Sequence, residues 1–138
     1  MPVTGAHHTS YTVIDMDATL RFYRDLLGFE VINERPEVIN DYFRKIIGFP
    51  DAVVHATLLR IPGTEHVLEL LQYINPKGNP QDLTPNNPGS SHICYIVDDL
   101  KSIYSRLFEE GVEFISPPVY LDEGPNVGGW ALYLRDPN

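Results

Sequence analysis

One segment of this sequence occurs twice, and the repetition constrains the fold more than any other feature. The first copy is H-T-S-Y-T-V-I-D, His8 to Asp15, and the second is H-I-C-Y-I-V-D-D, His92 to Asp99. An offset of 84 positions superimposes the His, Tyr, Val and final Asp of the two copies. Each copy then enters a stretch whose apolar residues fall at helical spacing. We therefore predict a strand followed by a helix in each copy.

Both predicted helices carry boundary signals at the same places. Asp15 and Asp99 are N-cap candidates, and Gly28 and Gly111 stand where a helix usually ends. A strand-like segment follows each glycine, over residues 29–33 and 112–116. The shared order of strand, helix, glycine and strand predicts a duplicated β-α-β unit.

The first copy continues into further elements. An insertion, Glu34 to Pro50, follows, and we predict a short helix within it over residues 40–47. Two strands follow, Val53 to Ile61 and His66 to Tyr73, joined by a turn at Pro62-Gly63. The first copy, residues 1–75, is thus predicted to be a β-α-β-β-β module.

The second copy is shorter. A linker rich in proline covers residues 76–89, and the second module, residues 90–138, adds a strand over Trp130 to Arg135. The sequence then reaches Asp136-Pro137-Asn138, before a fourth strand. We expect a single α+β domain over residues 1–138 whose last strand is missing. Either the natural chain continues or the protein lacks that strand, and we favour a clipped chain.

Composition limits the possible partners. The 138 residues are 43% hydrophobic and 21% charged, as in a globular protein, and carry a formal charge of −9. That charge disfavours a nucleic-acid or anionic-membrane partner, and no apolar run is long enough to span a bilayer. A single cysteine, Cys94, excludes an intrachain disulfide. No signal peptide is recognisable, so we expect a cytoplasmic protein that binds a small molecule.

Strand alternation places the two repeated histidines on comparable faces. His8 shares a face with Ser10 and Thr12, and His92 shares one with Cys94. The helix after each strand should cover the opposite, apolar face. The histidine faces should therefore look toward whatever the two copies enclose.

Glu69 is the third candidate residue of a functional site, after His8 and His92. It lies within Val67–Leu71, a run that otherwise reads as a strand buried on both faces. Removing a carboxylate from water costs several kcal/mol unless a cation or good donors replace the water. Two imidazoles and a carboxylate suit Zn, Ni, Co, Fe or Mn. We therefore predict one divalent metal ion bound by His8, Glu69 and His92.

Other residues offer competing explanations for Glu69. Arg60 could pair with it, although the tight turn should place Arg60 opposite Glu65 or His66. Glu69 would then face Ala56 or Thr57. His55 could lie diagonal to Glu69, as a hydrogen-bond partner or a rival ligand.

The remaining histidines and the cysteine have simpler interpretations. His7 and His66 look exposed, and His7 should point to the face opposite His8, because it is one residue out of the repeat register. Cys94 is expected to be a small core residue lining the cleft, with nothing nearby to activate its thiol.

These motifs together resemble the vicinal oxygen chelate superfamily, which includes glyoxalase I, methylmalonyl-CoA epimerase, fosfomycin-resistance proteins, bleomycin-binding proteins and extradiol dioxygenases. The resemblance runs along nearly the whole chain. It rests on F-Y-R-D-L-L-G-F (residues 22–29), L-E-L (68–70), S-H-I-C-Y-I-V-D-D-L (91–100) and L-R-D-P-N (134–138). It implies paired βαβββ modules that form an open, U-shaped mixed sheet around a metal. It also implies ligands at His8, Glu69 and His92, with a fourth, a glutamate, on a strand beyond residue 138.

The resemblance implies a chemistry as well. A metal with open positions chelates two adjacent substrate oxygens and stabilises an enediolate while a base removes a proton. Glu69 and the glutamate implied beyond residue 138 are both candidates for that catalytic base. We expect a homodimeric lyase or isomerase of the glyoxalase I kind, acting on a hydroxyacyl group or a 2-oxoaldehyde adduct. The alternatives are an Fe(II) dioxygenase of the extradiol type, and a metal-free protein that binds an antibiotic or metabolite.

Overall fold

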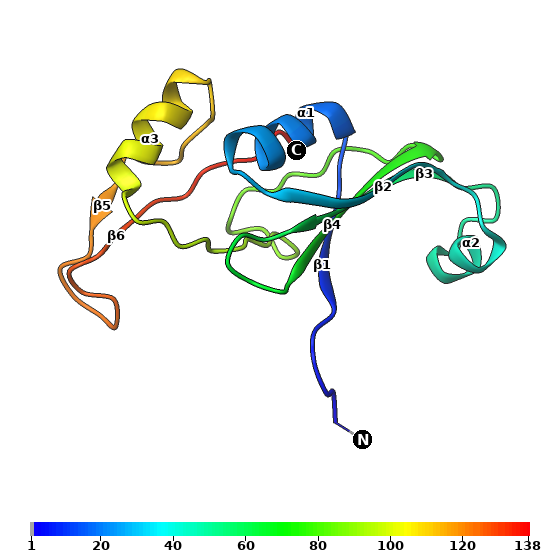
Figure 1. Ribbon diagram of the computed structural model, residues 1–138, viewed down its shortest axis with the longest axis horizontal. Coiled ribbons are helices and arrows are strands. Elements are labelled where there is room, and N and C mark those ends of the chain that lie inside the picture. The colour runs from blue at the N-terminus through cyan, green and yellow to red at the C-terminus, as the bar shows by residue number, and fades with distance from the viewer. Residues whose placement is uncertain (1) are drawn as a thin grey trace. The chain divides into compact units, whose positions relative to one another are not determined.

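The computed structural model describes residues 2–138, which divide into two compact units (Figure 1). The first unit comprises the chain up to Pro80 together with Pro137–Asn138, and the second runs from Gln81 to Asp136. The module boundaries after residues 75 and 89 stay a prediction.

A four-stranded mixed sheet forms the centre of the first unit. Its strand order is β1-β4-β3-β2, so β1 (His8–Thr12) lies at one edge and pairs in parallel with β4 (Val67–Asn75). The strand β3 (Val53–Arg60) pairs antiparallel with β4 and with β2 (Glu30–Val38). The mixed α+β class predicted from the sequence is confirmed.

The first helix begins where the sequence predicts but changes type halfway. Asp15 caps α1 (Met16–Leu20), because its Oδ1 accepts a 3.0 Å hydrogen bond from the Ala18 amide. The prediction of one α-helix up to residue 27 was wrong in its second half, since η1 (Arg21–Leu26) is a π-helix. Two consecutive aromatic side chains there, Phe22 and Tyr23, are each 4% exposed.

The two faces of the sheet have different surroundings. One face carries the fully buried side chains Leu59, Leu68 and Leu70, on the side where α1 contacts β4. The opposite face has a buried apolar cluster at one end, where α2 (Asp41–Ile47) packs. That apolar end consists of Val38, Ala52, Val54, Ala56 and Leu71, with Phe43, Ile47 and Tyr73 packed against it. The other end of this face holds the polar residues described below.

The predicted insertion forms both an edge strand and the helix α2. Pro36 lies in β2, at an irregularity in the pairing with β3 between Arg35 and Val38. Proline is tolerated there because β2 is an edge strand. Helix α2 then ends at Gly48, whose φ of 77° is the left-handed conformation that favours glycine.

The second unit contains α3 (Leu100–Glu109), β5 (Val119–Tyr120) and β6 (Trp130–Ala131). The Asp99 carboxylate accepts a 3.0 Å hydrogen bond from the Ser102 amide, so its predicted N-cap role is confirmed. The strands β5 and β6 pair antiparallel, and a bridge between Phe114 and Leu134 extends the pairing. The segments predicted as strands over 112–116 and 130–135 are therefore adjacent but only partly regular.

One predicted strand of the second unit did not form. Within residues 2–138, no strand is assigned over 92–97. The equivalent strand β1 of the first unit pairs only with β4, the fourth strand of its own module. The described part of the second module has no such fourth strand, so residues 92–97 have no equivalent strand with which to form backbone hydrogen bonds. No helix among residues 2–138 is long and apolar enough to cross a membrane.

Candidate functional site

Glu69 lies on β4 beside two side chains of β1. Ser10 and Glu69 are register partners on the two parallel strands, and the Ser10 hydroxyl donates a 2.9 Å hydrogen bond to Glu69 Oε1. His8 is on the same face two residues earlier, with its Nε2 3.7 Å from the same oxygen. The structure therefore brings together two of the three predicted ligands, His8 and Glu69, and Ser10 contacts the same carboxylate.

The prediction that Glu69 sits in a strand buried on both faces was wrong. Its side chain is 18% exposed, whereas Leu68 and Leu70 on either side are fully buried. The apolar end of this face begins two residues later at Leu71. Glu69 thus stands at the boundary between the apolar and polar ends, where a hydroxyl and water can both solvate its carboxylate.

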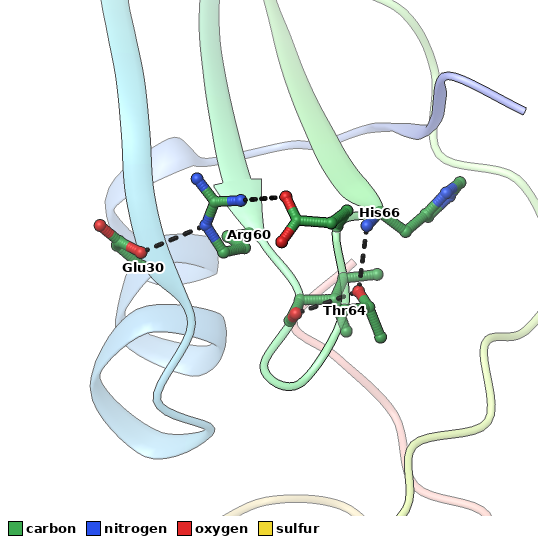
Figure 2. A network of polar contacts seen from close by, with 6 residues as sticks. Glu30, Arg60, Thr64 and His66 are labelled. Atoms are coloured by element: carbon green, nitrogen blue, oxygen red, sulfur yellow. Dashed lines mark hydrogen bonds and ion pairs between the residues drawn. The ribbon is translucent and has the colours of Figure 1, made fainter.

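The predicted pairing register around Glu69 was also wrong. Glu69 is opposite Leu58 and Arg60 is opposite Val67, because the connection between the strands is longer than a two-residue turn. Arg60 is not the partner of Glu69. Its guanidinium donates to Glu65 at 3.0 Å and to Glu30 at 3.4 Å. Figure 2 draws the contact between Arg60 and Glu30.

His55 also has a different partner, Glu34, and does not contact Glu69. Its Nε2 lies 2.8 Å from Glu34 Oε1, and it is paired in register with Gln72 on the face opposite Glu69. The alternative in which His55 holds Glu69, or competes with it for a metal, is therefore wrong for the described residues.

Three further sequence predictions need correction. His7 was expected to point away from His8, but the two Nδ1 atoms are 2.7 Å apart, since His7 precedes β1 and strand alternation does not apply to it. His66 is part-buried rather than exposed, and its Nε2 bonds Thr9 Oγ1 at 2.9 Å. Its backbone amide donates to the Thr64 hydroxyl (Figure 2). Cys94 is exposed and not a core residue, because the strand predicted to bury it is not formed.

His92, the third predicted ligand, belongs to the second unit. Its ring lies against that of Tyr133, with centroids 5.1 Å apart. Among residues 2–138, no three His, Cys, Asp or Glu side chains gather closely enough to hold a metal ion. The three-residue metal site therefore stays a prediction.

The donors in the first unit fit two positions of such a site. Two ligand atoms that each lie about 2.0–2.2 Å from one ion can be at most about 4.4 Å apart. The separation of 3.7 Å between His8 Nε2 and Glu69 Oε1 is within this limit. An imidazole nitrogen and a carboxylate oxygen are also a donor pair that suits first-row divalent metals.

Tyr73 adds a second group that responds to the Glu69 charge. Burial raises the pKa of the Tyr73 phenol, and the negative charge of Glu69 raises it further. The phenol is therefore a hydrogen-bond donor at neutral pH. It stands on the same face as Glu69, four residues along β4, and its ring contacts Phe49 at 5.9 Å between centroids.

Sequence reasoning missed the roles of Ser10, His7 and Tyr73. Ser10 was placed on the His8 face, so the signal was present, but its contact with Glu69 depends on the parallel register of β1 and β4. His7 and Tyr73 carry no such signal, because their contacts depend on the chain entering β1 and on the packing of α2.

Comparisons with known proteins give a consistent assignment. The family described as the glyoxalase/bleomycin resistance protein/dioxygenase superfamily matches residues 5–137. A 2-epi-5-epi-valiolone epimerase from an Actinomyces species is 27% identical over 136 residues, covering 96% of this chain and 74% of the epimerase. A lactoylglutathione lyase from Schizosaccharomyces pombe is 28% identical over 121 residues. That match covers 78% of this chain but only 37% of the lyase.

A solved structure shows the same fold. It is a mutant of the genomically encoded fosfomycin resistance protein of Listeria monocytogenes, complexed with Mn(II) and a dihydroxypropylphosphonic acid. The TM-score is 0.64 at 19% identity, with 98% of this chain and 86% of that chain covered.

Proposed function

Because the chain belongs to the glyoxalase/bleomycin resistance protein/dioxygenase superfamily, we propose that it is a metal-dependent lyase or isomerase of the glyoxalase I kind. The observation that carries the proposal is the pairing of His8 and Glu69 on one open sheet face, 3.7 Å apart. The enzymes among its relatives, an epimerase and a lactoylglutathione lyase, support a reaction in which a proton moves on or next to a carbon bearing oxygen.

His8 and Glu69 are the residues of the first unit that would hold the ion, and His92 is the proposed third ligand. A bound divalent ion would supply Lewis acidity, drawing charge from two adjacent oxygens of the substrate. The Mn(II) complexed with the fosfomycin resistance protein supports a divalent ion as cofactor.

Glu69 has one oxygen for positioning and one for proton transfer. The contacts with Ser10 and His8 both fall on Oε1, so Oε2 is the oxygen that Glu69 offers to a substrate. We infer that Oε2 takes a proton from the carbon next to the substrate carbonyl. The electron pair of the broken C–H bond becomes part of an enolate, whose negative charge lies on the carbonyl oxygen.

The same residue can complete the reaction. Glu69 then returns the proton to the former carbonyl carbon, while the proton of the adjacent hydroxyl passes to the former carbonyl oxygen, and the substrate is isomerised. Epimerisation would need a second acid on the opposite face of the enolate. Atoms and charge balance without an oxidant, so the substrate needs only adjacent oxygens and one acidic C–H bond. The proposed partners are this small molecule and, in a homodimer, a second copy of the chain.

Metal binding is the first test. The protein is stripped with a chelator and titrated with Ni²⁺, Co²⁺, Zn²⁺, Mn²⁺ and Fe²⁺, and bound metal is measured by mass spectrometry. We expect one tight site, lost in both His8→Ala and Glu69→Gln but kept in His66→Ala, because His66 bonds Thr9 on the other face. Absence of binding with every ion would overturn the proposal and favour sequestration of a small molecule.

Proton exchange is the second test. The metal-loaded protein is incubated in D₂O with the hemithioacetal of methylglyoxal and glutathione, and with hydroxyacetone, and deuterium uptake at carbon is followed by NMR. Uptake that disappears in Glu69→Gln supports Glu69 as the base. Oxygen consumption with Fe²⁺ and a catechol, without deuterium uptake, would instead favour the dioxygenase.

A further inference from the structure

The residue before β1 contacts the proposed metal ligand directly. His7 Nδ1 lies 2.7 Å from His8 Nδ1, and the two rings meet edge to face with centroids 5.0 Å apart and an interplanar angle of 85°. The other nitrogen of His8, Nε2, is the one that faces Glu69. The two nitrogens of one imidazole therefore have different partners.

A hydrogen bond between two imidazole nitrogens needs a proton on one of them and a lone pair on the other. A neutral imidazole carries its hydrogen on only one nitrogen, so the donor in this contact determines the tautomer of both rings. If His8 donates through Nδ1, its Nε2 has a lone pair facing Glu69. If His7 donates instead, His8 must carry its hydrogen on Nε2.

Only the first arrangement can bind a metal ion through Nε2, because coordination needs the lone pair of that nitrogen and so leaves the hydrogen on Nδ1. The negative charge of Glu69, whose Oε1 lies 3.7 Å from Nε2, works against it by attracting a hydrogen to Nε2, although the distance is too long for a hydrogen bond. Glu69 Oε1 already accepts the Ser10 hydrogen at 2.9 Å. Donation from His8 Nδ1 to His7 gives a good hydrogen bond and leaves the Nε2 lone pair directed at the position a metal would take.

We propose that His7 is a positioning residue that accepts the Nδ1 proton of His8 and so keeps His8 Nε2 in the form that binds metal. This inference rests on the proposed function, in which His8 is a ligand. Ligand histidines usually donate their second N–H to a carboxylate, a carbonyl or water, and such partners raise metal affinity. Here a neighbouring imidazole takes that role, which also orients a ring that is 38% exposed.

Two substitutions of His7 separate the acceptor from the ring. His7→Phe keeps an aromatic ring beside His8 but removes the acceptor nitrogen. His7→Asn removes the ring but places an amide oxygen near the position of Nδ1, where it can accept the proton. Because His7 is exposed and precedes the first strand, neither change should affect folding.

The first measurement is made on metal-free protein. The tautomer of His8 is read from the ¹⁵N shifts of its two ring nitrogens at about pH 8.5, where an ordinary imidazole is neutral. We expect the Nδ1–H form in the wild type and in His7→Asn, and a shift toward the Nε2–H form in His7→Phe. An Nε2–H form of His8 in the wild type would overturn the proposal.

The second measurement is metal affinity, obtained by competition with a chromogenic chelator. His7→Phe should weaken Zn²⁺ binding about 10–100-fold, as loss of such a partner typically does, and His7→Asn should restore most of it. An unchanged affinity in His7→Phe, with binding still lost in His8→Ala, would overturn the role of His7 alone. An affinity that is unchanged in His7→Phe and also in His8→Ala would instead overturn the proposed function.

Discussion

The hydroxyl of Ser10 on β1 donates its hydrogen to Glu69 on β4, across 59 residues of sequence. The contact explains how an acidic residue is accommodated in an apolar strand before any ion binds. Glu69 has a hydroxyl donor, a nearby imidazole and partial access to water, so it is neither an isolated charge nor part of a buried ion pair.

Glu69→Gln should therefore separate stability from metal binding. The amide oxygen can still accept the Ser10 hydrogen bond, so we expect the free energy of unfolding to change by less than about 1 kcal/mol. Metal-dependent stabilisation should disappear. Thermal melts of the wild type and Glu69→Gln, each with and without a chelator, measure both effects, and Ser10→Ala is the matched control that keeps the carboxylate. If the chelator leaves the wild-type Tm unchanged while Glu69→Gln lowers it sharply, Glu69 is structural.

Thr57→Val should stabilise the protein. Thr57 is fully buried, and its Oγ1 has no hydrogen-bond partner among the described residues. Valine has nearly the same shape without the hydroxyl, so the free energy of unfolding should rise by about 1 kcal/mol. Thr19→Val is the matched control, because Thr19 is equally buried but donates to Asp15 and accepts from Asn138. Urea unfolding should show opposite signs for the two variants.

The two helix caps should be equivalent in energy. Asp15→Ala and Asp99→Ala each remove one side-chain bond to a backbone amide, at a cost of about 1 kcal/mol of stability. Asn40, which precedes α2, makes no side-chain cap bond, so Asn40→Ala should cost clearly less. Amide hydrogen exchange at the first turn of each helix measures the three effects separately. A loss at Asn40 as large as at Asp15 would contradict the cap assignment.

Tyr73 should make stability fall at high pH. Its pKa is raised in the folded protein, by burial first and by Glu69 second, so the folded state holds the phenolic proton more tightly than the unfolded chain does. The stability from the neutral phenol is complete below the ordinary tyrosine pKa of about 10 and is lost as pH rises through the folded value. Tyrosinate absorbance of the wild type minus Tyr73→Phe gives the midpoint. Glu69→Gln should lower it, and a midpoint at or below the ordinary value would contradict the assignment.

The periodic parts of the fold could be predicted from the sequence. Caps at Asp15 and Asp99, the short helix after Asn40 and the two long strands of the first module follow from local chemistry, and the structure has all of them. The π-helix did not follow, because apolar spacing predicts that a stretch is helical but does not distinguish π-turns from α-turns. Local sequence signals predict where a helix begins more reliably than they predict the type of its turns.

The candidate site could be predicted only in part. His8 and Glu69 were identified from the repeat and from an acidic residue in an apolar run, and they lie together. The register was wrong because the length of the loop at Pro62-Gly63 determines it, and that loop exceeds a tight turn. Contacts between exposed side chains outside regular elements, such as that of His7 with its sequence neighbour His8, have no periodic signature.

The position of β1 has a consequence for the order in which the molecule folds. Among the described residues β1 lies at the sheet edge and pairs with β4 alone, whereas β2, β3 and β4 are joined by local antiparallel connections. Closing a loop of 59 residues is slower than forming neighbouring hairpins, so docking of β1 should be a late event in folding. His8 and Glu69 meet only in that step. The contact between His8 and Glu69 should therefore form late in the folding of the first unit, and β1 should be the first strand of the sheet to separate on unfolding. An ion bound by both residues would hold β1 on β4 and so slow that separation.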